Sequence, residues 1–134
     1  TEADIAQSVN GDLDTFVFDF LDAVSMGRKD TAFSLLHNIL TAGSDVYAVT
    51  GLLVNHFELM LEIKELRRAG MYAPEISKTL KVHEFRVKKS IGFCEKFTID
   101  KLKSILIQLY EIDRNIKTGT LEPALALELL VGRI

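Results

Sequence analysis

Residues 98–119 read TIDKLKSILIQLYEIDRNIKTG, and this stretch decides the fold class. Its apolar residues recur every three or four positions, which is the spacing of one face of an α-helix. They are Leu102, Ile105, Leu106, Leu109, Ile112 and Ile116. Thr98 is a residue type that caps helix starts, and Gly119 is the residue type that most often follows a helix end. The pattern predicts an amphipathic helix over 99–118.

The segments on either side of this stretch have the same helical pattern. Asp12 or Asp14 can cap a first helix that runs to about Ser25, and glycines or a proline mark the ends of the others. The expected helices cover 29–41, 45–69, 74–80, 83–96 and a last segment that begins at Pro123. No run alternates apolar and polar residues as a strand does. We therefore predict an all-α fold, with residues 1–134 forming a single helical bundle-like domain of about six or seven helices.

Composition limits where such a protein can work. The 134 residues suit one ordinary domain. Cys94 is the one cysteine, so no internal disulfide can form, and we expect a buried structural thiol in a reducing, cytoplasmic compartment. No window approaches 18 uncharged apolar residues, which predicts no membrane span. The chain lacks a starting Met and a signal-peptide pattern, and we expect it to be a piece of a larger protein.

The net charge of −3 hides a strong asymmetry along the chain. Residues 1–63 hold ten acidic and two basic residues, whereas residues 64–103 hold eleven basic and five acidic ones. A basic segment on an acidic protein binds an anionic partner or the chain's own acidic half. DNA is therefore one expected partner of the basic segment 64–103.

The sequence offers no recognisable catalytic, cofactor or metal site. Lys117-Thr118-Gly119 falls at a helix end, whereas phosphate-binding loops lie at helix starts. The three histidines, His37, His56 and His83, fit no metal-ligand spacing. We therefore predict no enzyme activity, no cofactor, no metal and no small-molecule substrate for this fragment. A small hydrolase, considered as a further interpretation, has almost no support among the residues.

Residues 73–91 read APEISKTLKVHEFRVKKSI, a short helix, a tight turn at Lys81–Val82 and a basic helix. Five apolar residues have the spacing of a helix-turn-helix core: Ile76, Leu80, Val82, Val87 and Ile91. In a DNA-binding protein of that kind, the second helix enters the major groove. It would present Arg86, Lys88 and Lys89 to the bases. Two helices joined by a tight turn occur in most all-helical domains, so the pattern has low specificity.

Three pieces of sequence resemble a known family. The first is His56-Phe57 and the long helix that follows to Gly70. The second is EISKTLKVHEFRVKKS at 75–90, and the third is DRNIKTGTLEP at 113–123, followed by Glu128. The preceding FDFLDAVSMGRKDTAFSLLHNIL at 18–40 is similar to the family's two short helices. Together they resemble the C-terminal domain of the delta subunit of the bacterial DNA polymerase III clamp loader.

The resemblance implies a helical domain that packs beside the matching domains of other loader subunits to form a pentameric collar. The whole subunit in this family has an AAA+-like N-terminal part, and delta is not known as an ATPase. The parent complex, DNA polymerase III, is a nucleotidyltransferase. The resemblance also places candidate interface residues in the second and third pieces. They are Phe85, Arg86, Lys88, Lys89, Asp113 and Lys117.

We therefore expect an assembly domain that works in DNA replication and binds the C-terminal domains of the other clamp-loader subunits. The alternative is a helix-turn-helix regulator that reads DNA through the helix at 83–96. The two differ in salt dependence, because phosphate contacts give DNA binding a steep salt slope and helix packing against a protein does not.

Overall fold

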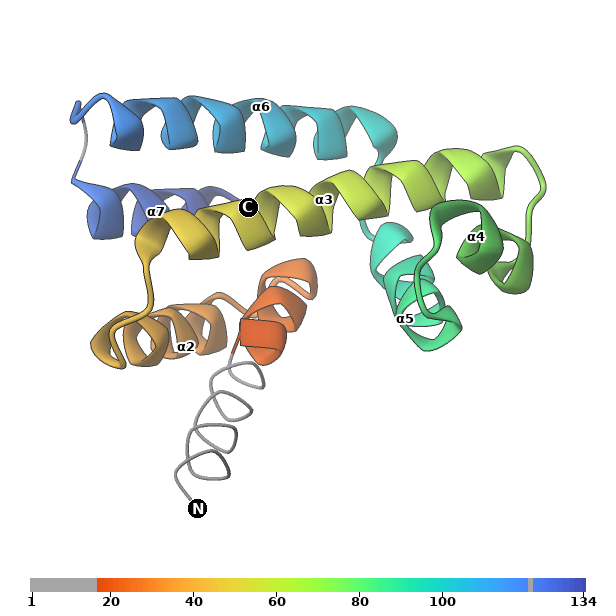
Figure 1. The fold of residues 1–134 in the computed structure, drawn as a ribbon, viewed down its shortest axis with the longest axis horizontal. Coiled ribbons are helices and arrows are strands. Elements are labelled where there is room, and N and C mark those ends of the chain that lie inside the picture. Colours follow the sequence, from red (N-terminus) through yellow and green to blue (C-terminus); the bar gives the residue numbers. More distant parts are fainter. Residues whose placement is uncertain (1–16, 121) are drawn as a thin grey trace, which may run out of the picture. The chain divides into compact units, whose positions relative to one another are not determined.

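The computed structural model describes residues 17–120 and 122–134, and Figure 1 shows that this part of the chain is built from helices and short connections. A helix covers residues 17–25. Six further helices follow: α2 (Lys29–Thr41), α3 (Val46–Arg68), α4 (Ala73–Leu80), α5 (Glu84–Cys94), α6 (Ile99–Lys117) and α7 (Pro123–Arg133). The described residues contain no strand. The predicted all-α fold class is confirmed.

Side chains and glycines bound the helices, among them Thr98 and Gly119, which were expected to do so. The Thr98 hydroxyl accepts a hydrogen bond from the Lys101 backbone N–H at 3.0 Å. The Asp45 carboxylate accepts one from the Tyr47 N–H at 2.9 Å, at the start of α3. Gly119 follows α6 with φ of +77°, a conformation that side chains with a Cβ rarely adopt. The predicted cap at Asp12 or Asp14 lies outside the described residues.

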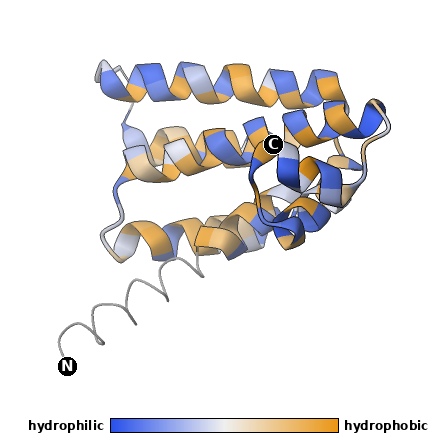
Figure 2. Ribbon diagram, turned by 45° about the vertical axis from the view of Figure 1, so that its right-hand side comes forward, coloured by the Kyte–Doolittle hydropathy of each residue, from blue (hydrophilic) through white to orange (hydrophobic). Residues whose placement is uncertain are grey.

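The apolar stripe that decided the fold class lies in the core. All six stripe residues of α6 are buried, from Leu102 to Ile116. Figure 2 shows hydrophobic and hydrophilic residues alternating around this helix, as expected for one apolar face. At about 25 cal/mol per Å² of apolar surface, each fully buried leucine or isoleucine contributes roughly 1.5–3 kcal/mol of hydrophobic stabilisation.

The chain divides into two compact units. One consists of the described residues up to Leu52 together with Ile112–Ile134, and the other is Leu53–Glu111. The boundaries fall inside α3 and α6, so each of these helices contributes residues to both units. The expectation that residues 1–134 form one domain stays a prediction.

In the first unit, α2 lies against α7. Lys29 at the start of α2 donates a hydrogen bond from Nζ to the Gly132 carbonyl at 2.8 Å, near the end of α7. A positive charge at a helix C-terminus is favourable, because the last carbonyls carry partial negative charge. Buried residues from both helices form the core of this unit, among them Leu36, Ile39, Leu127 and Leu130.

In the second unit, α4 and α5 form a tightly connected pair. The part of α3 that belongs to this unit contributes buried Phe57, Met60 and Ile63. The rings of Phe57 and Phe97 meet edge to face, with their centroids 6.1 Å apart. Such aromatic pairs stabilise a core by more than their buried area alone.

Helix α3 is long and apolar enough to cross a membrane by length and composition, and 39% of its apolar window is buried inside the structure. The core helix of a soluble protein passes the same test, so this is weak evidence for a membrane span. Leu53, Phe57, Met60 and Ile63 lie on α3 and are fully buried, which is how a core helix behaves.

Candidate assembly surface

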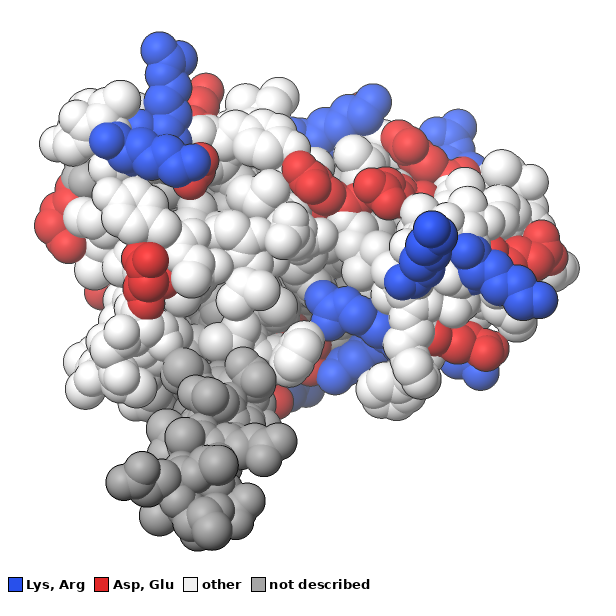
Figure 3. Space-filling model, in the orientation of Figure 1, with Lys and Arg blue, Asp and Glu red and all other residues white. Residues whose placement is uncertain are grey.

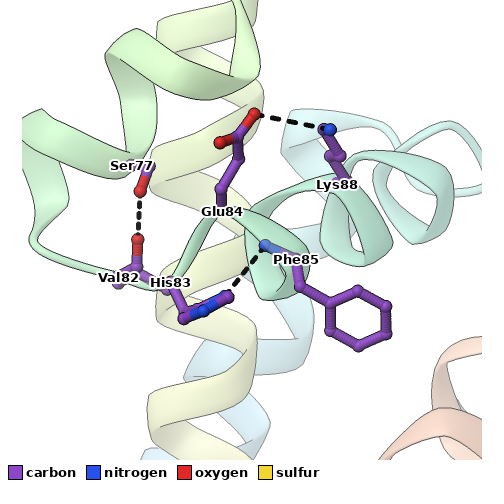
Figure 4. Close-up of polar contacts among 6 residues, drawn as sticks. All are labelled: Ser77, Val82, His83, Glu84, Phe85 and Lys88. Carbon is purple, nitrogen blue, oxygen red and sulfur yellow. Dashed lines mark hydrogen bonds and ion pairs between the residues drawn. The ribbon is translucent and has the colours of Figure 1, made fainter.

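The turn between α4 and α5 is held by backbone and side-chain hydrogen bonds. Lys81 has φ of 57° and ψ of 42°, the left-handed conformation that commonly ends a helix. The Ser77 carbonyl accepts hydrogen bonds from the N–H groups of Lys81 and Val82. The Ser77 hydroxyl donates to the Val82 carbonyl, as Figure 4 shows. The turn predicted at Lys81–Val82 is therefore present, and a lysine occupies its left-handed position.

The start of α5 is capped by a histidine, which the sequence analysis did not identify. Nδ1 of His83 accepts a hydrogen bond from the Phe85 N–H at 3.2 Å. The helix begins at Glu84 and ends at Cys94, whereas the predicted range was 83–96. The cap at His83 sets the first limit. At the other end, the N–H groups of Lys96 and Phe97 bond three residues back, so the last turn is tighter than α-helix.

Four of the six candidate interface residues lie on α5. Phe85 is 70% exposed, and Figure 4 shows its ring extending from the start of α5 away from the turn that precedes the helix. Lys88 and Lys89 are exposed, and Arg86 is half-buried. Nζ of Lys88 lies 3.4 Å from a carboxylate oxygen of Glu84, one helical turn earlier. Glu84 thus offsets part of the charge of Lys88. Figure 3 shows acidic and basic side chains side by side on the face of the molecule that it draws.

The inner face of α5 belongs to the core. Val87 is fully buried and Ile91 is half-buried, which agrees with the expectation that both face inward. Cys94 is buried, as predicted for a structural thiol, and its Sγ donates to the Met60 carbonyl at 3.2 Å. Burial raises the pKa of this thiol from 9.0 to about 11, although the positive charge of Lys64 acts in the opposite direction. The thiolate, which is the reactive form, is therefore disfavoured.

A buried histidine packs against this inner face. His56 on α3 is only 3% exposed, and its ring lies edge-on to Phe93 with the centroids 6.2 Å apart. Burial lowers its pKa from 6.5 to about 4, and the charge of Arg86 lowers it further in the same direction. His56 is therefore neutral near pH 7 and contributes to the core as a small aromatic ring.

The remaining two candidate residues lie at the end of α6. Nζ of Lys117 is 2.9 Å from a carboxylate oxygen of Asp113, so the two residues form an ion pair across one turn of the helix. The pair belongs to the first unit, whereas α5 belongs to the second. The six candidate residues therefore fall into two groups, with one group in each unit. A role for either group in an interface stays a prediction.

Other features of the surface were not found from the sequence. The Glu122 carboxylate caps α7 by accepting hydrogen bonds from the N–H groups of Ala124 and Leu125, at 3.1 and 2.8 Å. Its position directly before Pro123 was a usable signal, because proline favours the first helical position and the residue before it is the cap. Among residues 17–120 and 122–134, no group of three or more His, Cys, Asp and Glu could hold a metal ion.

The fold and surface define the class: an all-helical domain with charged and apolar side chains on its outer helix faces. Residues 14–134 match the family described as DNA polymerase III delta subunit, C-terminal domain. The chain belongs to this family, and the predicted resemblance is confirmed. This match favours the clamp-loader interpretation, and the helix-turn-helix regulator is not supported.

One relative found by sequence and one solved structure found by fold are both delta proteins of Bacillus subtilis. The chain is 27% identical over 128 residues to DNA polymerase III subunit delta of Bacillus subtilis (strain 168). It superimposes on the Bacillus subtilis DNA clamp loader delta protein (YqeN) with a TM-score of 0.83 and 26% identity over 90% of this chain. The chain spans 37% of the first relative and 36% of the second.

Proposed function

We propose that this domain joins a clamp-loader subunit to its neighbours by packing against their C-terminal domains during DNA replication. Family membership gives the setting, and large apolar side chains left in water support the role. On α7, Leu125 and Leu129 are 48% and 46% exposed. They are four residues apart and so lie on one face of the helix. On α6, Ile107 and Tyr110 form a similar pair.

The α7 pair is the observation that carries this proposal. Single exposed leucines are common on protein surfaces, but two on one helical face form a patch that a partner helix can cover. The buried residues of α7, such as Leu127 and Leu130, already hold the helix in the core of the first unit. The exposed pair is therefore available to a second protein without disturbing that core.

In this proposal, charge selects the partner and apolar contact holds it. The Lys and Arg side chains of α5 steer association with acidic surfaces, while the leucines of α7 supply affinity. In this proposal the domain carries out no catalytic step, and it acts in the cytoplasm with the rest of the loader. The proposal follows the family's expected role and does not depend on any cofactor.

The proposal is tested by replacing the apolar pair in the full-length subunit. Leu125→Glu with Leu129→Glu should weaken assembly with the other loader subunits by at least about 30-fold, because interface hot spots contribute about 2 kcal/mol or more. The melting temperature should change little. Glu128→Ala on the same helix, also exposed, is the matched control. Full assembly by the double variant would overturn the proposal.

A further inference from the structure

An open pocket of about 240 Å³ lies at the end of α3, where the chain turns toward α4 in Figure 1. It lies within the second unit and is formed by the last turns of α3 and α5. Its walls are Lys64, Arg67, Arg68, Ile91, Cys94 and Glu95. Three of these six residues are cationic and one is acidic, so the pocket carries a net positive charge.

The cations of this pocket are only partly used by the protein itself. Lys64 donates one hydrogen bond from Nζ to the Cys94 carbonyl at 2.6 Å, which leaves two of its N–H groups. Arg68 is exposed, and within the described residues its guanidinium has no hydrogen bond or ion pair. One guanidinium group can bind two phosphate oxygens at once, and it stays positively charged at any ordinary pH.

An exposed aromatic ring lies beside one of these cations, Arg67. The Arg67 guanidinium carbon is 5.9 Å from the centre of the Tyr72 ring. Tyr72 is 67% exposed and precedes α4 in an extended conformation, without a side-chain hydrogen bond that caps the helix. Neither the core nor the cap of α4 therefore requires this ring. Nucleic-acid bases stack on exposed aromatic side chains of this kind, and the neighbouring Arg67 adds a positive charge for the phosphates.

Two groups oppose an anion in this pocket. Glu95 contributes a carboxylate, and the Cys94 carbonyl lies at the negative end of α5. The hydrogen bond from Lys64 neutralises much of the partial negative charge at the Cys94 carbonyl. A small free anion therefore gains little here. A strand that places several phosphates along the arginines and a base on Tyr72 gains more, because stacking adds to the charge interaction.

We propose that this corner, defined by Lys64, Arg67, Arg68 and Tyr72, binds single-stranded DNA, with phosphates on the cations and a base on the tyrosine. The inference rests on the proposed function only in that a clamp loader works beside DNA. Duplex DNA fits less well, because its bases are stacked inside the helix and cannot reach the ring. An acidic protein surface would use the arginines but would not need the exposed ring.

The experiment measures binding of a fluorescein-labelled oligothymidine strand to the full-length subunit by fluorescence anisotropy over a range of salt concentrations. Arg67→Ala with Arg68→Ala should reduce affinity by at least about tenfold. It should also lower the slope of log affinity against log salt by about 1.4, since each phosphate contact on a single strand contributes about 0.7. Tyr72→Ala should reduce affinity by roughly 5- to 150-fold, the range for one stacked base, and Tyr72→Phe should retain binding.

The matched control is Lys101→Ala with Lys103→Ala, which removes two exposed lysines from α6 in the same unit. The proposal is overturned if this control loses as much affinity as the arginine variant, because binding would then follow overall charge. It is also overturned if Tyr72→Ala binds like the wild type, or if the arginine variant loses assembly with loader subunits and keeps DNA binding. Loss of DNA binding with normal assembly supports DNA binding at this corner and does not bear on the proposed role of α7.

Discussion

The two faces of α5 have opposite chemistry within one short helix. The inner face carries Val87 and Phe93, and His56 packs against it as a neutral ring. The outer face carries Lys88 and Lys89, both exposed to solvent. Substitution or protonation of groups on the inner face alters the free energy of unfolding, because buried groups lose packing or gain charge. Changes outside leave that free energy nearly unchanged, so their effects appear only when a partner binds.

The largest effect should come from protonating His56. The unfolded chain binds this proton below pH 6.5, whereas the folded chain binds it only below about pH 4. The stabilisation is therefore complete above pH 6.5 and is lost as the pH falls toward 4. The loss should amount to about 3 kcal/mol, since each pKa unit corresponds to about 1.4 kcal/mol.

The measurement compares urea unfolding of the wild type and His56→Gln at about pH 7 and about pH 4.5. Carboxylates titrate in both proteins and cancel in the difference. The wild type should be the more stable protein at the higher pH, and its advantage should shrink by more than half at the lower pH. An advantage that does not change with pH would show that His56 is not held neutral by the core.

The second effect concerns the outer face. Lys88→Glu with Lys89→Glu should slow association of the full-length subunit with the other loader subunits by about tenfold at low salt, because reversed charges oppose electrostatic steering. The free energy of unfolding should change by no more than about 0.5 kcal/mol. In high salt the two association rates should converge, since screening removes the steering.

Lys101→Glu with Lys103→Glu is the control for the basic helix, because it makes the same change in net charge on α6. If both double variants slow association equally, the steering comes from total charge and not from α5. Stopped-flow fluorescence at two salt concentrations gives the rates. Equal rates for the wild type and the α5 variant at low salt would reduce the outer face to a solvated surface.

The smallest effect should come from Lys117→Ala, which removes the ion pair with Asp113. The Lys117 side chain is largely exposed, so the pair contributes only about 0.3–0.5 kcal/mol to stability. Assembly should weaken by a few-fold, measured as the dissociation constant of the reconstituted loader. Lys101→Ala, which removes another exposed lysine from α6, is the comparison. A sharp drop in melting temperature with unchanged assembly would make Lys117 a structural residue.

The sequence predicted what local interactions determine. The stripe of α6 and the glycine after it specify one helix without reference to the rest of the chain, and both are found as expected. The burial of Cys94 followed from its residue type. The cap by His83 escaped prediction because histidine is a rare cap, and the bond forms only in the conformation that this turn adopts.

The candidate sites were harder to predict because they depend on packing between helices. Arg67 and Tyr72 are five residues apart across a turn, and only the path of the chain between α3 and α4 brings the guanidinium to the ring. The neutrality of His56 likewise depends on the phenylalanine and arginine of α5 that surround it. Neither relation can be derived from helical periodicity, since each joins residues that do not lie on the same helix.

The most direct test of the assembly role identifies what contacts α7 in the complete loader. A photo-crosslinking amino acid replaces Leu129 in the full-length subunit, and the loader is reconstituted, irradiated and analysed by mass spectrometry. The same amino acid at Glu62, an exposed position on α3 in the second unit, shows the background. We predict adducts from position 129 to the C-terminal domains of other loader subunits. An assembled loader whose adducts from position 129 fall only on other regions would contradict the proposed role.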